Sequence, residues 1–381
     1  MENHSGKNLR TTVLKYVLLV IATAMVLAPA NVQAAEITVG CVGAPAGLMY
    51  PTIAAALASG LDRSAQNTIT VQGTCTNEDL RIVDYTGNLT IQGPAGGVAT
   101  IEQDQTDCDI SPASHANLPV LTLIDSVQVT LRRLVIRGGR GVSIDDSGMI
   151  ASGVTVEESR STAIGLSNTS WLMLNGGTAP NFIQDNCGTA ISVSLASTVN
   201  LNSNNTIRNN LQGLLVSGRA NLNPNTVPGS TLLIELHRDQ GVIVEEQGRV
   251  DINGQVIIQN NATNPTTAFD HAAVVIGKGG TLNVNGSGLQ IVSNNGPGIW
   301  AYMLSKVQMG TALAGANVTI SGNAEEGLRL EQMSVAWSFA GSTITGNTGA
   351  DVTCDKTSLL FGNVNGISVN KCANTEKEKK K

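Results

Sequence analysis

Aromatic and charged residues are both scarce in this sequence. Phe, Trp and Tyr make up 3% of the 381 residues, and Asp, Glu, Lys and Arg together make up 14%, against about 25% charged residues in ordinary soluble domains. The formal net charge is −6, which argues against a basic surface for DNA or RNA. Glycine is abundant, with 41 residues, as are Asn, Thr, Ser and Val. This composition predicts many short strands joined by tight turns, and few long helices.

Long apolar segments are also rare, and the clearest one lies at the amino terminus. Lys7, Arg10 and Lys15 precede an apolar run over residues 16–27, and the A-x-A-like stretch Val32–Ala34 follows. This order is typical of a secretory signal peptide, which we assign to residues 1–34. The run is too short to span a bilayer comfortably as an anchor. We expect a secreted or periplasmic protein with no membrane span after signal removal.

Motifs for metals and cofactors are missing. No C-x-x-C pair indicates zinc, and no nucleotide-binding loop, haem motif or serine-hydrolase elbow occurs. The six cysteines are Cys41, Cys75, Cys108, Cys187, Cys354 and Cys372. Their even number fits disulfides in an exported protein. Because they are close in the sequence, we expect Cys41 to pair with Cys75 and Cys354 with Cys372. Cys108 and Cys187 are left as the remaining pair.

A repeat is the strongest feature that is present. An isoleucine followed three residues later by an asparagine recurs along the second half of the chain. The asparagines are Asn186, Asn210, Asn261, Asn294, Asn323 and Asn347, and the equivalent position after Ile234 holds His237. Most of these units are 24 to 29 residues apart. A glycine and two further short apolar runs usually follow, so each unit reads as three strands separated by three turns.

The physics of such a unit predicts the fold. A coil of three short strands cannot bury its inward side chains alone, but coils stacked about 4.8 Å apart pair every strand and form a continuous core. Asparagine tolerates the left-handed conformation of a sharp turn, and its amide can bond to its counterpart in the next coil. We therefore predict an all-β, single-domain right-handed parallel β-helix of roughly ten coils, with the asparagines as a structural ladder.

These residues resemble the pectin-lyase-like family of right-handed β-helices, from Val83 to Val369. Pro51–Ala58 looks like the short amino-terminal capping helix that covers the first coil in this family. The expected organisation is a signal peptide (1–34), a cap with the first strands (35–82), the β-helix (83–372) and a disordered charged tail (373–381). The resemblance implies recognition or processing of a polysaccharide or surface glycan, and we expect the protein to be a monomer.

The resemblance also implies two catalytic designs, a hydrolase and a lyase. Family hydrolases use clustered aspartates with G-H-G and R-I-K motifs, and neither motif occurs here. The tandem Asp145 and Asp146 would face opposite ways on a strand, so we interpret them as a turn. Pectate lyases use calcium, held by carboxylates, and a basic residue. Arginines are clustered at positions 132, 133, 137 and 140, but no set of acids stands out as a calcium cage. We expect no metal and no cofactor, with calcium only if the protein is a lyase.

The coil that interrupts the asparagine repeat is the best candidate for chemistry. His237, Arg238 and Asp239 lie there, and Asp270 and His271 follow an insertion in the next coil. His–Asp pairs can transfer protons or supply half of a metal site. For an enzyme, the two His and two Asp residues are our candidate catalytic groups, with Arg238 as a substrate contact. In the alternative interpretation, His237 replaces an asparagine in the turn, and Asp270 and His271 close a loop.

Two aromatic residues are candidate sugar contacts. Trp300 and Tyr302 alternate along one predicted strand and could face outward together, as platforms for the apolar faces of sugars. The scarcity of other aromatics argues modestly against a long depolymerase cleft. Two functions remain open: a polysaccharide lyase or glycoside hydrolase, and a non-catalytic β-helix for surface binding, adhesion or scaffolding.

Overall fold

The computed structural model describes residues 34–45, 47, 50–103, 108, 118–194, 196–224, 229–265, 271–286, 288–310, 317–339, 341–364 and 367–369. The chain divides into Met1–Ala34 and Ala35–Lys381, and every strand below belongs to the second unit. Among the described residues, none belongs to a helix long and apolar enough to cross a bilayer.

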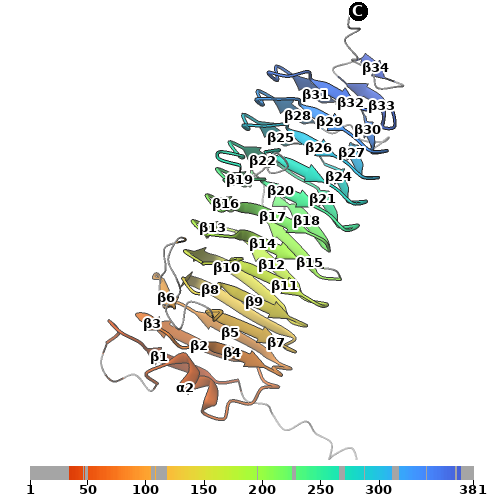
Figure 1. Ribbon diagram of the computed structural model, residues 1–381. Helices are drawn as coiled ribbons and strands as arrows, with labels where there is room; N and C mark the ends of the chain where they lie inside the picture. Colours follow the sequence, from red (N-terminus) through yellow and green to blue (C-terminus); the bar gives the residue numbers. More distant parts are fainter. Residues whose placement is uncertain are drawn as a thin grey trace, which may run out of the picture. The chain divides into compact units, whose positions relative to one another are not determined.

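Each coil contributes one strand to each of three parallel rows, which we call the first, second and third strand rows (Figure 1). The first row contains β1 (Glu36–Gly40), β2 (Asn67–Gln72), β5 (Asn88–Gln92), the starts of β8 (Gln128–Arg137) and β10 (Gly148–Glu157), β12 (Trp171–Asn175), β15 (Thr198–Asn202), β18 (Arg219–Asn223), β21 (Arg249–Ile252), β24 (Thr281–Val284), β27 (Lys306–Met309), β30 (Val335–Ser338) and β33 (Leu359–Val364). The second row contains β3 (Thr74–Thr76), β6 (Ala99–Glu102), the ends of β8 and β10, β13 (Asn181–Gln184), β16 (Asn205–Arg208), β19 (Leu232–Glu235), β22 (Val256–Gln259), β25 (Leu289–Val292), β28 (Val318–Ser321) and β31 (Ser342–Thr345). The third row contains β4 (Leu80–Val83), β7 (Leu121–Ile124), β9 (Val142–Asp145), β11 (Ile164–Ser167), β14 (Thr189–Val193), β17 (Gln212–Val216), β20 (Val242–Val244), β23 (Val274–Ile276), β26 (Ile299–Ala301), β29 (Leu328–Leu330) and β32 (Val352–Cys354).

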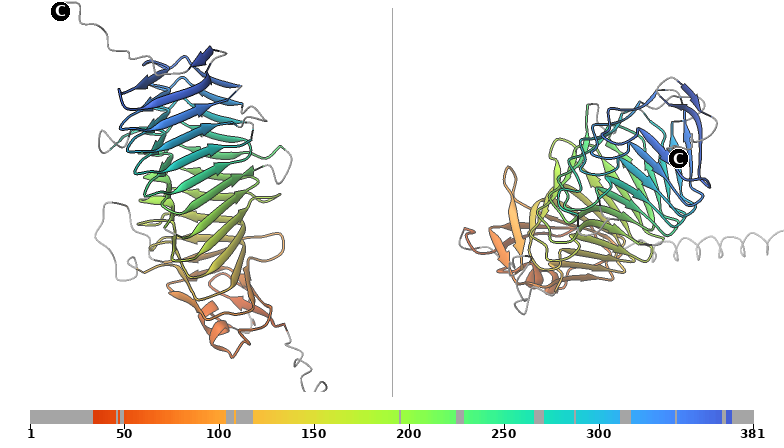
Figure 2. Two further views of the ribbon diagram at one scale, coloured as in Figure 1. Left: turned by 90° about the vertical axis from the view of Figure 1, so that its right-hand side faces the viewer. Right: turned by 45° about the horizontal axis from the view of Figure 1, so that its top comes forward.

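The stacking follows the sequence, and it confirms the predicted parallel β-helix. For example, β15 pairs in parallel with β18, β16 with β19 and β17 with β20. The colours in Figure 2 run in order along the stack, so each coil lies beside the coil that precedes it in the chain. Strand pairs of this kind satisfy the backbone of every interior coil from above and below.

Alternation along each strand separates the core from the surface. In β21, Val250 and Ile252 are buried within the central hydrophobic core, whereas Asp251 between them points to the outer face. The inward Val, Ile and Leu residues of all three rows belong to one continuous cluster. Each coil therefore buries its apolar side chains against the next coil, and the outward positions are left to other roles.

The amino-terminal end carries the predicted short helix. Helix α2 (Ile53–Ala58) begins at Thr52, whose hydroxyl accepts a hydrogen bond from the Ala55 N–H at 3.0 Å. The Glu78 carboxylate accepts the N–H groups of Ile53 and Ala54 at 3.1 and 2.9 Å. The helix packs against β1, β2 and β4, with Ile53 buried. At the other end, β34 (Ile367–Val369) pairs antiparallel with β33.

Disulfides join Cys41 to Cys75 and Cys108 to Cys187. The first was predicted from proximity, and the second from the cysteines that remained. Cys354 also belongs to a disulfide. Its expected partner, Cys372, lies outside the described residues.

The repeated asparagines lie in the turn between the second and third rows. The side-chain N–H of Asn186 donates to Asn210 Oδ1 at 2.7 Å. Equivalent bonds of 3.0, 2.9 and 2.8 Å link Asn261 to Asn294, Asn294 to Asn323 and Asn323 to Asn347. Each of these turns therefore contributes one amide to a hydrogen-bonded column that is largely buried.

Candidate functional site

The outer face of the first strand row carries a column of polar side chains that ends in two aromatic rings. One residue from each successive strand occupies this column, because strand pairing places them in register. The residues, which we call the amide row, are Asn200, Asn221, Asp251, Asn283, Gln308, Trp337 and Phe361. They cover seven consecutive coils, from β15 to β33.

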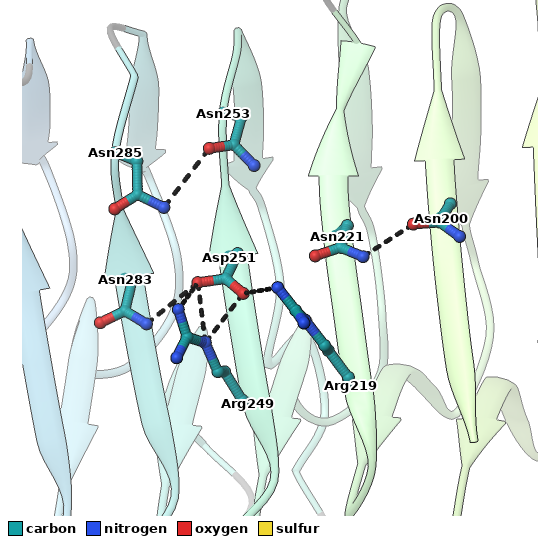
Figure 3. A network of polar contacts seen from close by, with 8 residues as sticks. All are labelled: Asn200, Arg219, Asn221, Arg249, Asp251, Asn253, Asn283 and Asn285. Atoms are coloured by element: carbon teal, nitrogen blue, oxygen red, sulfur yellow. Dashed lines mark hydrogen bonds and ion pairs between the residues drawn. The ribbon is translucent and has the colours of Figure 1, made fainter. Parts of the chain in front are cut away.

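Hydrogen bonds connect several members of this row (Figure 3). The Asn221 amide donates to Asn200 Oδ1 at 2.7 Å, and the Asn283 amide donates to Asp251 Oδ1 at 3.0 Å. Beside the row, Asn285 donates to Asn253 at 3.3 Å. Such links between coils hold the amides in defined orientations. Asn200 and Asn221 are partly exposed, whereas Asp251 and Asn283 are buried.

Asp251 is the carboxylate at the centre of this surface. The Arg249 guanidinium donates to both of its oxygens at 2.8–2.9 Å, and Arg219 donates to Oδ2 at 3.2 Å (Figure 3). The carboxylate side chain is 4% exposed, whereas those of Arg219 and Arg249 are 56% and 52% exposed. Burial acts to raise the pKa of Asp251, but the hydrogen bonds from Arg249 and Asn283 and the two positive charges lower it overall. The group is therefore an ionised anchor for two arginines, which remain accessible to a ligand.

The aromatic end of the row is accessible as well. Trp337 is 36% exposed, and its ring stacks on that of Phe361 with 6.4 Å between centroids and 23° between planes. A stacked pair of this kind forms a flat apolar surface beside the polar column.

The predicted catalytic residues His237 and Asp239 are both buried, at 0% and 2% exposure. His237 takes the place of an asparagine in the ladder. Its ring Nδ1 accepts a hydrogen bond from the backbone N–H of Asn210 at 3.2 Å, and its backbone N–H donates to Asn261 Oδ1, also at 3.2 Å. Burial lowers the pKa of His237 to about 3, so the ring is neutral near pH 7. These contacts match the alternative interpretation, in which His237 serves the turn.

The other candidate groups lie apart from the amide row, in the turns beside the third row. His271 Nε2 lies 3.2 Å from Glu325 Oε2, and Asp270 falls outside the described residues. Arg238 donates to the backbone carbonyl of Asn264 at 3.2 Å. Among the described contacts, His237 bonds to ladder neighbours and His271 bonds to Glu325, so the two imidazoles belong to separate networks.

Trp300 and Tyr302 do lie together, with 5.4 Å between ring centroids. Trp300 is only 5% exposed. Its ring therefore supports Tyr302 from behind, and an open platform at this position would have to come from Tyr302.

Several residues of the acidic and basic runs near the first coils have partners within the protein. Arg137 forms a 2.5 Å ion pair with Glu157, and Asp145 accepts a hydrogen bond from Ser167 at 2.7 Å. Asp146 follows β9 with a positive φ of 46°, as expected for a turn. Within the described part of the chain, the group with metal-ligand spacing is Cys41, Cys75 and Glu78. Since both cysteines form a disulfide, this group is not a metal site.

Comparisons with known proteins find similarity at the level of fold. No protein-family model matches the sequence, and no curated protein matches it significantly. The structure of pectate lyase Pel9A aligns with 13% identity and a TM-score of 0.46, over 88% of this chain and 81% of the other. ORF18 of Geobacillus virus E2 aligns with 11% identity and a TM-score of 0.41, over 81% of this chain but only 55% of the other. At these values, neither similarity supports an inference about function.

Proposed function

We propose that this protein recognises an extended polysaccharide outside the cytoplasm and binds it along the amide row without cleaving it. The observation that carries the proposal is the in-register column from Asn200 to Phe361. Its members repeat at the strand spacing of about 4.8 Å. An extended sugar chain advances by a similar length per residue, so successive sugars can meet equivalent side chains.

The chemistry of the column suits sugar hydroxyls. Amide side chains both donate and accept hydrogen bonds, as hydroxyl groups do, and the Trp337–Phe361 pair offers an apolar surface for a ring face. Arg219, Arg249 and Lys306 lie on one register line beside the column. These cations outnumber Asp251, so the surface favours a chain that carries carboxylate or sulfate groups.

The state of Asp251 supports binding without hydrolysis at this surface. Glycosidases need two carboxyl groups that flank the scissile bond, one of them protonated as the acid. In the described part of the amide row, Asp251 is the single carboxyl group, and its lowered pKa keeps it ionised. A carboxylate held by two arginines is also a weak base.

Export is the second element of the proposal. Two described disulfides fit an oxidising compartment, in line with the signal peptide expected at residues 1–34. We assign the protein to the periplasm or the extracellular medium, where it would act as a monomer.

A binding assay tests the proposal. Affinity electrophoresis or calorimetry of the purified protein with acidic and neutral polysaccharides should detect binding that salt weakens for acidic chains. Trp337→Ala should weaken it by up to about tenfold, because a contact with an aromatic ring is worth roughly 0.5–1.5 kcal/mol beyond the area that it buries. Thr319→Ala, on the outer face of the second row, is the matched control and should bind like the wild type. Binding that Trp337→Ala leaves unchanged would rule out this surface.

Enzymatic processing is tested in parallel. The same polysaccharides are followed for unsaturated products and reducing ends, with and without calcium, beside an Asp270→Ala, His271→Ala double variant. We expect no turnover. Turnover that the double variant abolishes would instead establish an enzyme at the ladder-interrupting coils, and turnover that survives would establish an enzyme with its site elsewhere.

A further inference from the structure

A second candidate site lies on the outer face of the third strand row, where four consecutive outward positions are apolar. Strand pairing places Leu215, Ile243, Val275 and Trp300 in one register column. The same column holds Thr122, Ser143, Gly165 and Ser192 in the preceding coils, and Arg329 and Thr353 in the following ones. Ile243, Val275 and Trp300 are only 6%, 4% and 5% exposed, so neighbouring side chains cover most of this apolar stretch.

This stretch forms the floor of a pocket of about 220 Å³. Leu215, Ile243 and Val275 line the floor. Gln212 and Gln240 line one wall, and Glu245 and Tyr302 line another. The pocket is smaller than the ~300–1,000 Å³ of pockets that hold drug-sized molecules, so its ligand is correspondingly small.

The amide wall is held in place by a chain of hydrogen bonds. Thr189 Oγ1 donates to Gln212 Oε1 at 3.0 Å, and Gln212 Nε2 donates to Gln240 Oε1 at 3.1 Å. Both glutamine side chains thus have fixed orientations at the rim of the pocket, next to an aliphatic floor.

The opposite wall presents a carboxylate. Tyr302 donates its hydroxyl to Glu245 Oε1 at 3.0 Å, and Lys278 Nζ donates to Glu245 Oε2 at 2.8 Å. A carboxylate has about four acceptor positions, so these bonds leave capacity for ligand hydroxyls. Trp300 supports the Tyr302 ring from behind, and its Nε1 donates to Glu331 at 3.1 Å.

We propose that this pocket binds one neutral sugar ring, such as the terminal residue of a glycan. The C–H face of a sugar fits an aliphatic and tyrosine surface, and its hydroxyls fit the amide and carboxylate walls. Glu245 lines the pocket and its ion-pair partner Lys278 does not, so the charged group that faces the ligand is a carboxylate, which disfavours an acidic sugar. An entirely apolar ligand would leave the polar walls unmatched. The site lies on a different strand row from the amide row, so it does not rest on the function proposed above.

Saturation-transfer NMR with single sugars tests this site. The panel contains glucose, galactose, mannose, N-acetylglucosamine, fucose and rhamnose, with glucuronic and galacturonic acids as acidic comparisons. At least one neutral sugar should bind, and the acidic sugars should bind more weakly. Leu215→Trp, which fills the pocket, should reduce affinity at least tenfold, and Glu245→Gln, which keeps the shape but removes the charge, should reduce it several-fold.

Controls separate this site from the amide row. Circular dichroism establishes that each variant is folded, and Glu245→Gln carries the test if Leu215→Trp is not. Trp337→Ala should leave binding of the single sugar unchanged even where it abolishes polysaccharide binding. The proposal is overturned if no neutral sugar in the panel binds, if acidic sugars bind best, or if Glu245→Gln binds like the wild type.

Discussion

The backbone N–H of Asn210 donates a hydrogen bond to Nδ1 of His237 across 3.2 Å, at a coil where the ladder has an imidazole in place of an amide. For Nδ1 to accept, the neutral ring must carry its proton on Nε2. Nε2 is buried, and the ring also interacts with the backbone of Ile207 in the preceding coil. A Cβ on Gly213 would lie 2.1 Å from the Gly241 carbonyl oxygen and 3.0 Å from Nε2 of His237. Glycine is therefore required at position 213 mainly by the neighbouring backbone, and the imidazole adds a second close contact. The ladder thus tolerates one titratable member, provided that it stays neutral.

The first prediction concerns acid sensitivity. The pKa of His237 falls from 6.5 to about 3 on folding, so between these values the unfolded chain binds a proton that the folded chain does not. The free energy of unfolding therefore decreases as the pH falls, by up to ~1.4 kcal/mol per pH unit. His237→Asn should remove this dependence. The midpoint of urea denaturation of the variant, compared with that of the wild type, should therefore be higher at pH 4.5 than it is at pH 7.

A histidine in a different environment provides the control for that prediction. His271 lies beside Glu325, outside the asparagine ladder, so His271→Asn makes the same substitution while leaving the ladder contacts in place. The difference between the two variants therefore reports the ladder position. Equal pH dependence of wild type and His237→Asn would show that another group is responsible.

The second prediction concerns Asp251. Asp251→Asn removes the charge that holds Arg219 and Arg249 and should lower the free energy of unfolding by about 1–2 kcal/mol, since the exposed guanidinium groups can still turn to water. It should also strengthen binding of acidic polysaccharides several-fold, because the two cations are released. Asp125→Asn, at an exposed turn position with φ of 48°, is the matched control for denaturation and binding. A variant as stable as wild type would mean that the ion pairs contribute nothing net.

The third prediction concerns Tyr302. Burial and the Glu245 carboxylate raise its pKa to about 12 from 10. The folded protein thus keeps this proton where the unfolded chain loses it, so the contribution is present below pH 10 and is lost as the pH rises toward 12. Difference titration of phenolate absorbance between wild type and Tyr302→Phe should reveal one group that ionises near pH 12. Ionisation near pH 10 would contradict the Tyr302–Glu245 hydrogen bond.

The fourth prediction concerns the amino-terminal cap. Cys41 and Cys75 are 34 residues apart, and in the chain-entropy description a loop of this length stabilises the fold by about 3–4 kcal/mol. The double variant Cys41→Ser, Cys75→Ser should therefore increase hydrogen exchange in β1 and α2. Exchange in the central strands β18 to β21 should change little, because coils contact mainly their neighbours. Uniformly faster exchange along the whole chain would instead show that the β-helix unfolds as one unit.

The architecture was predictable because inward positions obey one common rule. Every coil must bury its apolar side chains against its neighbours, so Val, Ile and Leu recur with the period of the coil. The turn that follows Ile207 or Ile291 needs a residue that tolerates tight geometry and bonds to the next coil, and asparagine meets both needs. The short helix and the Cys41–Cys75 disulfide were accessible for a similar reason, since each depends on residues close in the sequence.

The candidate sites depend on contacts that the sequence did not reveal. Asp251 meets both Arg219 and Asn283 across 32 residues, and Glu245 meets Tyr302 across 57. Coil lengths vary through insertions in the turns, and outward residues share no requirement comparable to burial. Sequence periodicity therefore determined which residues point inward and that the chain forms a β-helix, whereas only the register between stacked coils decided which outward residues meet to form a surface or a pocket.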